Sequence, residues 1–329
     1  MFRMPFRFAM RRVKNRPRQH LIVSRVHNRF VHVGYLIFRS VDARNILWSN
    51  AIISLASSAC VLASFQLAHV KFSHGLGGAF ALGIGSATWL AYTWQRHVKS
   101  TRAGGLRPAH QVWHQKRRPS LKACAFFLIP LATIPAILTS QVFPLLSGSS
   151  PLALLALLLV ATSVTALYAG LPGECGERQA LRRIPGAKMI WIAGAWVTIT
   201  ALWPIWWSTA GVSALPPETL FICGERFLVI AALTLPFDLR DTKWDPEGMR
   251  TWAQVLGDHG TRWLALALVT LAIAFRLYIL PAPAWGPLVG LLAMGPAVLM
   301  ARRDRPETYY GLLDALLIFD ALGLLLFLD

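Results

Sequence analysis

The apolar residues of this chain are gathered into long blocks, and most charged residues lie between the blocks. Of the 329 residues, 55% are hydrophobic and only 15% are charged, whereas about 25% of a soluble domain is charged. A helix that crosses a bilayer needs roughly 20 mainly apolar residues. The candidate blocks are residues 49–70, 77–95, 122–146, 151–170, 189–211, 217–237, 262–281, 285–300 and 310–328. The sequence therefore predicts an all-α membrane protein with about nine transmembrane helices.

The lysines and arginines are concentrated in alternate connections between these blocks. Thirty of the 33 lie in the stretch before the first block or in the segments 96–122, 171–188, 238–262 and 301–309. Nine alternating helices place all five segments on one side, and basic connections face the cytoplasm. The N-terminus is therefore predicted inside and the C-terminus outside. The same topology explains most of the net charge of +18 without a nucleic-acid partner.

Residues 1–48 form a basic arm ahead of a predicted transmembrane domain, residues 49–329. The arm has no acidic residue before Asp42. Such a segment is expected to lie on an anionic lipid surface. A transit peptide for an organelle and a nucleic-acid-binding arm are the alternatives. The predicted partners are thus the lipid bilayer and, through the arm, other proteins. The predicted location is a bacterial inner membrane, and the alternative is the inner membrane of an organelle.

Three aspartates follow the sixth block in the run PFDLRDTKWDPEG: Asp238, Asp241 and Asp245. On a helix, their offsets of three and seven residues place them within a sector of about 60°. Three like charges on one face repel each other, and Mg²⁺ binds carboxylates together with substrate phosphates. One interpretation is therefore a seat for Mg²⁺ and diphosphate. The alternative is a solvated helix end whose aspartates pair with Arg240 and Lys243.

The run FDLRDTKWDPEGMRTWAQVLG, leaving the sixth of nine helices, resembles the second aspartate motif of UbiA-type polyprenyl transferases. Two further stretches are similar to that family: Tyr168 with the later LRRIPGAKMIWIAGAW, and the final ETYYGLLDALLIFDALGLLL. The resemblance covers about residues 44–329. It implies a nine-helix UbiA-like bundle that uses Mg²⁺ to transfer a prenyl group from an isoprenoid diphosphate to a lipophilic acceptor. Asp238, Asp241 and Asp245 would then be the catalytic, metal-binding residues.

The first aspartate motif of that family has no counterpart here. Members carry Asn-Asp, two residues, Asp, three residues and Asp at the end of the second helix, and the corresponding positions are Ala91, Tyr92, Gln95 and Lys99. No Asp or Glu occurs between Asp42 and Glu174. A metal site on both sides of the diphosphate is therefore not expected.

Basic side chains are predicted to replace the missing carboxylates, because Arg and Lys can neutralise a leaving diphosphate directly. The predicted diphosphate-binding residues are Arg96, Lys99, Arg182, Arg183, Lys188 and Lys243. The alternative is that these residues only set the membrane topology. For the whole chain, the alternative is a non-catalytic UbiA-fold subunit of a membrane complex that holds a lipid, a quinone or a pigment.

Other polar or small residues lie within or close to the blocks. Glu225 and Arg276 are expected to form a structural pair, since ionisable groups in a span usually pair; a relay or ligand role is the alternative. Tyr and Trp residues near helix ends, Trp191 and Trp196 among them, are expected in interfacial belts. His110 and His114 are expected to be solvated. The glycines near the second block, including Gly83 and Gly85, are expected to permit close helix packing.

Overall fold

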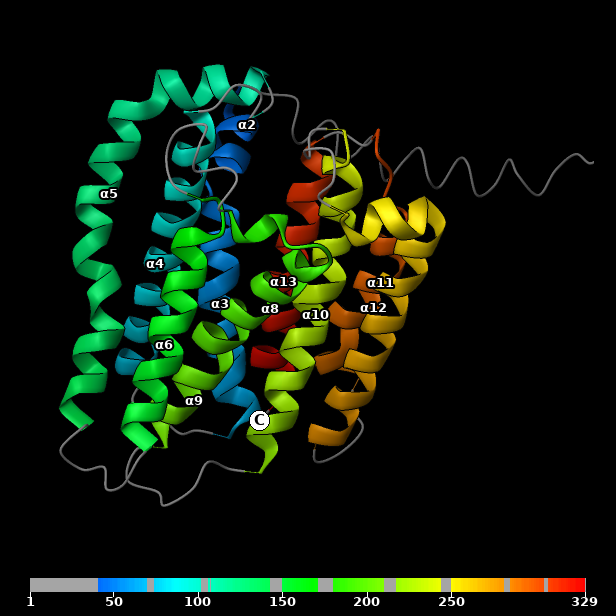
Figure 1. The fold of residues 1–329 in the computed structure, drawn as a ribbon. Helices are drawn as coiled ribbons and strands as arrows, with labels where there is room; N and C mark the ends of the chain where they lie inside the picture. The colour runs from blue at the N-terminus through cyan, green and yellow to red at the C-terminus, as the bar shows by residue number, and fades with distance from the viewer. Residues whose placement is uncertain are drawn as a thin grey trace, which may run out of the picture. The chain divides into compact units, whose positions relative to one another are not determined.

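The computed structural model of the protein describes residues 41–69, 74–101, 106, 108–142, 150–170, 180–209, 217–243, 250–280, 285–304 and 307–328. Most of the predicted arm, as well as Glu174 and Asp245, lies outside these residues. The chain from Arg44 to Asp329 forms one compact unit, in which every described regular element is a helix. Figure 1 shows these helices side by side in a bundle.

Helices occupy all of the predicted blocks within the described residues. The elements are α2 (Val41–Trp48), α3 (Ala51–Leu67), α4 (His74–Ser100), α5 (Pro108–Val142), α6 (Ser150–Leu167), η2 (Leu181–Arg183), α8 (Ala187–Val197), η3 (Thr198–Leu202), α9 (Trp203–Ser208), α10 (Glu218–Asp241), α11 (Trp252–Ile279), η4 (Gly286–Leu288), α12 (Val289–Leu299) and α13 (Glu307–Phe327).

Four described helices are long and apolar enough on their own to cross a membrane: Ala109–Gln141, Ala187–Ser208, Glu218–Asp241 and Trp252–Ile279. The second of these is the continuous run of α8, η3 and α9. The prediction of an all-α membrane fold is therefore confirmed. The number of crossings and the sides on which the two termini lie remain predictions.

Helix α5 begins 14 residues before the predicted block and keeps its helical backbone through Pro119, Pro130 and Pro135. Its first part runs along the top of the bundle before the helix turns down the side (Figure 1). Proline removes a helical hydrogen bond and is a common cause of such bends. Phe126 and Phe127 on this helix are 73% and 71% exposed, as expected for side chains that face lipid.

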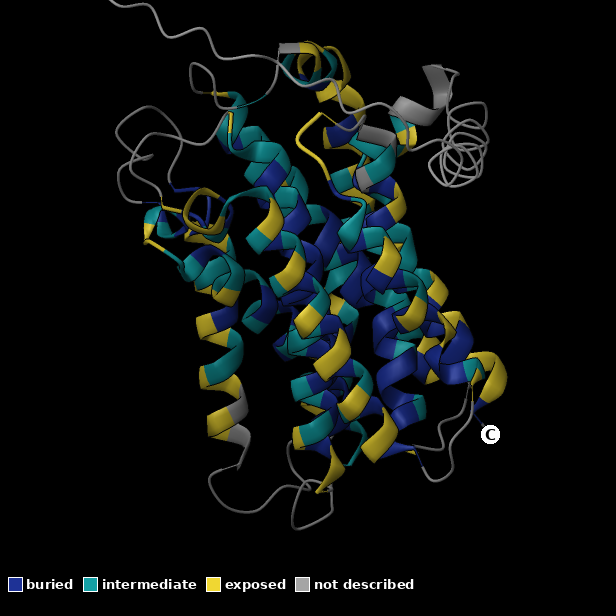
Figure 2. Cartoon of the chain, turned by 90° about the vertical axis from the view of Figure 1, so that its right-hand side faces the viewer, coloured by how far each residue is buried: buried dark blue, intermediate teal, exposed yellow. Residues whose placement is uncertain are grey.

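Buried residues lie on the sides of the helices that face one another, and exposed residues lie on their outer faces (Figure 2). Helix α10 contributes more buried residues than the described helices around it, and its Val229 and Leu235 pack with residues of α11, α12 and α13. Small residues allow close helix approach: a Cβ at Gly83 would overlap Pro135 of α5, and one at Gly85 would overlap Ser58 of α3. The predicted packing role is confirmed for these two glycines.

A charged network is buried in the core. The Arg276 guanidinium on α11 lies 2.5 Å from a carboxylate oxygen of Glu225 on α10 and 3.0 Å from one of Asp320 on α13. It also donates a hydrogen bond to the carbonyl of Pro287 at 2.8 Å. The predicted Glu225–Arg276 pair is confirmed, and Asp320 is a second partner. The network ties the consecutive helices α10 and α11 to α13, near the end of the chain.

Helix α11 bends near its start, at Gly257. This residue has φ 66° and ψ −175°, a region that is accessible essentially only to glycine. The segment before the bend opens with a capping box formed by Thr251 and Gln254. The Trp252 indole then donates a hydrogen bond to the Gly186 carbonyl at 3.1 Å. This hydrogen bond anchors the chain that leads into α8, where Lys188 lies.

Candidate functional site

A cavity of about 570 Å³ lies among α2, α3, α4, α6, α8, α10 and α13. Its charged residues come from helix ends that meet on one side of the bundle. Arg96 and Lys99 lie at the C-terminal end of α4, Lys188 lies at the start of α8, and Asp238 and Asp241 lie at the end of α10. Residues farther along the same helices continue the cavity into the apolar core.

Six of the predicted site residues line this cavity: Arg96, Lys99, Arg182, Lys188, Asp238 and Asp241. Three helices and η2 therefore bring together residues that are up to 145 positions apart in the sequence. Arg183 is half-buried and Lys243 is exposed, and both lie outside the described lining. Asp245, the third predicted metal ligand, falls among the residues that the structure does not describe.

Both described aspartates on α10 form ion pairs. The ammonium of Lys188 lies 2.6 Å from Asp238, and both side chains are almost completely buried. The guanidinium of Arg240 contacts both oxygens of Asp241, at 2.7 and 3.0 Å. Asp241 thus has the arginine partner that the solvated interpretation named. Asp238 is fully buried, however, so a solvated helix end does not describe it.

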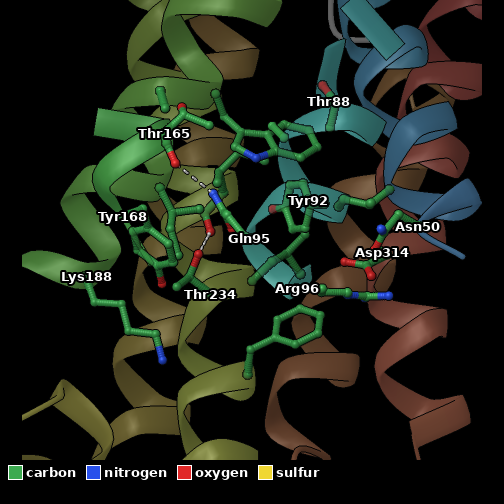
Figure 3. A pocket seen from close by; sticks show the side chains of 18 of the residues that line it. Asn50, Thr88, Tyr92, Gln95, Arg96, Thr165, Tyr168, Lys188, Thr234 and Asp314 are labelled. Atoms are coloured by element: carbon green, nitrogen blue, oxygen red, sulfur yellow. Dashed lines mark hydrogen bonds between the residues drawn. The ribbon is translucent and has the colours of Figure 1, made fainter. Parts of the chain in front are cut away.

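The cavity lining carries more positive than negative charge. Its described residues include five lysines or arginines and three aspartates. The fifth base is Arg240, and the third aspartate is Asp314 on α13, whose carboxylate points toward Arg96 (Figure 3). An excess of fixed positive charge in a partly apolar recess favours an anionic ligand.

The four positions that align with the missing first motif all face the cavity from α4: Ala91, Tyr92, Gln95 and Lys99. Contacts with neighbouring elements hold this wall in place. The Gln95 amide donates to the carbonyl of Thr165 on α6 at 3.2 Å, as drawn in Figure 3. Arg96 donates to the carbonyl of Trp48 on α2. This face of α4 therefore carries two cations, Arg96 and Lys99, and neutral groups but no carboxylate.

Aromatic and aliphatic side chains line the rest of the cavity. Tyr92, Trp191 and Trp196 lie there together with Ile199 and Leu233. The prediction that Trp191 and Trp196 belong to interfacial belts is wrong, because these residues line the cavity inside the bundle. Their position near one end of a hydrophobic block is common to both situations, so the sequence alone could not distinguish them.

Tyr168 follows directly after α6, on the same side of the cavity as Lys188 (Figure 3). It is close enough to Lys188 and Asp238 to interact with both electrostatically. A tyrosine hydroxyl is neutral near pH 7, so Tyr168 can donate a hydrogen bond to an anionic group in the cavity.

The two histidines expected to be solvated are packed against other rings. His114 is only 3% exposed, and its ring stacks on His97 with centroids 6.2 Å apart. His110 stacks on Trp48 at 5.2 Å. The expectation is therefore wrong for His114, because α5 begins earlier than the hydrophobic block and carries this residue against α4. Among the described residues, no group of three or more His, Cys, Asp or Glu could hold a metal ion.

Neither a family model nor a curated protein matches this sequence. Solved structures do. The apo structure of a UbiA homolog from Aeropyrum pernix K1 matches with a TM-score of 0.54 at 14% identity, covering 84% of this chain and 98% of that one. A UbiA homolog from Archaeoglobus fulgidus, solved with GPP and Mg²⁺, gives 0.48 at 12% identity, covering 84% and 99%. Its structure with DMAPP and Mg²⁺ gives 0.47 at 13% identity, covering 85% and 97%.

The first of these likenesses defines the class of fold. Over most of both chains, the helices follow the arrangement of the Aeropyrum homolog. The protein therefore has a UbiA-type fold, an all-helical bundle of an integral membrane protein, as the sequence predicts.

Proposed function

We propose that this protein is an intramembrane enzyme that transfers a prenyl group from an isoprenoid diphosphate to a lipophilic acceptor. The observation that carries the proposal is the division of the cavity into a basic part and an apolar, aromatic part. An isoprenoid diphosphate has the same division, with an anionic head and a hydrocarbon tail. The bacterial inner membrane is its proposed location, with the N-terminal arm on the cytoplasmic surface and available to protein partners.

The basic residues are proposed to bind the diphosphate and to assist its departure. When the bond between the first prenyl carbon and the diphosphate oxygen breaks, negative charge develops on the leaving group. Arg96, Lys99, Arg182 and Lys188 would stabilise this charge, and an arginine can bind two phosphate oxygens at once. Arg183 and Lys243, which lie outside the described lining, would contribute only by long-range attraction.

The apolar residues are proposed to bind the tail and to protect the reacting carbon. Trp191 and Trp196 offer aromatic faces, which attract the positive charge that develops on the allylic carbon. That carbon then bonds to the acceptor, the acceptor loses a proton to solvent, and diphosphate leaves. Exclusion of water by the apolar walls prevents simple hydrolysis of the donor.

Magnesium was expected on Asp238, Asp241 and Asp245, and in the Archaeoglobus structures Mg²⁺ accompanies the diphosphate. In this chain, Lys188 and Arg240 contact the carboxylates of the two described aspartates at 2.6 and 2.7 Å. A metal ion would have to displace both partners or approach them against their charge. The described residues thus do not fit a resident Mg²⁺, and no step is assigned to one.

The proposal is tested with purified protein in lipid nanodiscs, labelled isoprenoid diphosphates of several lengths, and a total membrane lipid extract as the source of acceptors. A labelled lipophilic product is expected, and Lys99→Gln should reduce its rate of formation at least tenfold. Lys116→Gln, which changes an exposed lysine on α5 outside the described lining, should leave the rate unchanged. Tight donor binding without any product would refute the enzyme and favour a lipid-holding subunit.

A further inference from the structure

We propose that the cavity binds the diphosphate group directly through its basic side chains and does not require Mg²⁺. The inference rests on the proposed function and concerns the way in which the same site recognises its donor. It departs from the magnesium site predicted from the three aspartates. Three observations carry it: the pairing of the carboxylates, the charge of the lining, and the sequence of the wall that α4 contributes.

The first observation is that both described aspartates on α10 are already neutralised. Asp238 has no exposed surface, and its oxygen lies 2.6 Å from the ammonium of Lys188. A magnesium ion binds carboxylate oxygens at about 2.0–2.1 Å, so on Asp238 it would lie within a few ångströms of that ammonium. Asp241 is held bidentately by Arg240. Two cations competing for one buried carboxylate repel strongly.

The second observation is the balance of charge around the cavity. The described lining has five lysines or arginines against three aspartates, which leaves an excess of positive charge before any ion binds. The bases come from α4, η2, α8 and α10, so they approach a central anion from several sides. Fixed positive groups of this kind can supply the charge that a divalent ion supplies in other phosphate sites.

The third observation concerns the wall that α4 contributes to the cavity. The sequence has no Asp or Glu between Asp42 and Glu174, so α3, α4 and α6 cannot offer a carboxylate to a metal. The end of α4 instead presents Gln95, Arg96 and Lys99 to the cavity. A diphosphate between α4 and α10 would therefore meet amide and cationic donors on the α4 side.

The test compares binding of geranyl diphosphate, inorganic diphosphate and geranyl monophosphate to the full chain in nanodiscs, in excess EDTA and in excess Mg²⁺. For geranyl diphosphate, we expect dissociation constants that agree within about threefold between the two conditions. Lys99→Gln should weaken binding in EDTA by about 10- to 100-fold, the usual effect of losing a hydrogen bond to a charged group. Lys116→Gln, the matched control, should change it by less than about twofold.

A second variant tests the idea in the opposite direction. Lys99→Asp places a carboxylate on the α4 wall, so it should weaken binding in EDTA and make binding respond to Mg²⁺. Thermal unfolding of each variant checks that it is folded. Weaker binding of the monophosphate and of inorganic diphosphate would show that both the second phosphate and the tail are recognised, whereas equal binding of all three ligands would overturn a diphosphate site.

The outcomes separate this inference from the proposed function. If EDTA weakens binding more than about tenfold and Mg²⁺ restores it, direct recognition is wrong, while prenyl transfer in Mg²⁺ would still support the enzyme. If binding is unaffected by EDTA but no acceptor is prenylated, direct recognition holds and the proposed reaction fails. Absence of binding in both conditions overturns both proposals.

Discussion

Arg276→Met removes the guanidinium that joins Glu225 and Asp320 inside the bundle. The arginine side chain is completely buried, and the variant loses contacts at 2.5 and 3.0 Å to two carboxylates, as well as the hydrogen bond to Pro287. Methionine nearly fills the same space, so a cavity contributes little. Removing one partner of a buried ion pair costs about 3–5 kcal/mol, because the other charge is left without compensation. We expect the free energy of unfolding to fall by about this amount.

The measurement is unfolding of the purified protein by SDS in mixed micelles, followed by tryptophan fluorescence. Arg303→Met is the matched control, because this arginine also contacts an aspartate at 2.6 Å, but the two side chains are 41% and 35% exposed. An exposed pair of this kind contributes about 0–1 kcal/mol. The two variants lose the same side chain and differ mainly in the burial of the pair.

A triple variant separates lost attraction from uncompensated charge. Adding Glu225→Gln and Asp320→Asn to Arg276→Met removes both carboxylates, so part of the lost stability should return. The reasoning would be refuted if Arg276→Met were no more destabilising than Arg303→Met. It would also be refuted if the triple variant were less stable than Arg276→Met alone.

Three further predictions use the same unfolding measurement. Gly257→Ala should lower the free energy of unfolding by about 1–3 kcal/mol, because alanine disfavours the backbone angles at the bend. The control is Gly194→Ala in α8, which has open space around it and should be neutral or slightly stabilising. Equal effects of the two variants would refute the argument. Gly290→Ala should cost about 1–3 kcal/mol, since its Cβ would overlap the backbone of α13; a change within about 0.5 kcal/mol would show that α12 and α13 can separate. Lys188→Gln should destabilise the protein by about 1–3 kcal/mol and weaken the binding of geranyl diphosphate. Adding Asp238→Asn to this variant should restore the stability but not the affinity. Recovery of both would show that Lys188 does not contact the ligand.

Parts of the candidate site could be predicted because they depend on neighbours along the chain. Asp238 and Asp241 lie three residues apart, and this spacing places them on one side of a helix wherever that helix packs. Both do line the cavity. The basic residues at the ends of α4 and α8 were identifiable because membrane topology places such ends on one surface. Lys188 and Lys99 meet there although 89 positions separate them.

Other parts of the site depend on contacts between helices and left no local signal. The sequence does not indicate that Lys188 on α8 pairs with Asp238 on α10. The same holds for the positions of Trp191 and Trp196, since a tryptophan near a helix end suits both the lipid interface and a cavity wall. The packing of α4, α6 and α8 around the cavity determines that these two tryptophans line the cavity and do not face the lipid interface.

The sequence by itself determined that this chain is a bundle of membrane helices, because the length and apolarity of each block are properties of a single segment in lipid. It also determined that carboxylates are absent from α3 to α6. Only the tertiary structure decided that the bases outnumber the aspartates in one cavity and that Arg276 joins two acids. The physical reason is that an ion pair or a cavity depends on distances across helices, which hydrophobic periodicity along one helix does not specify.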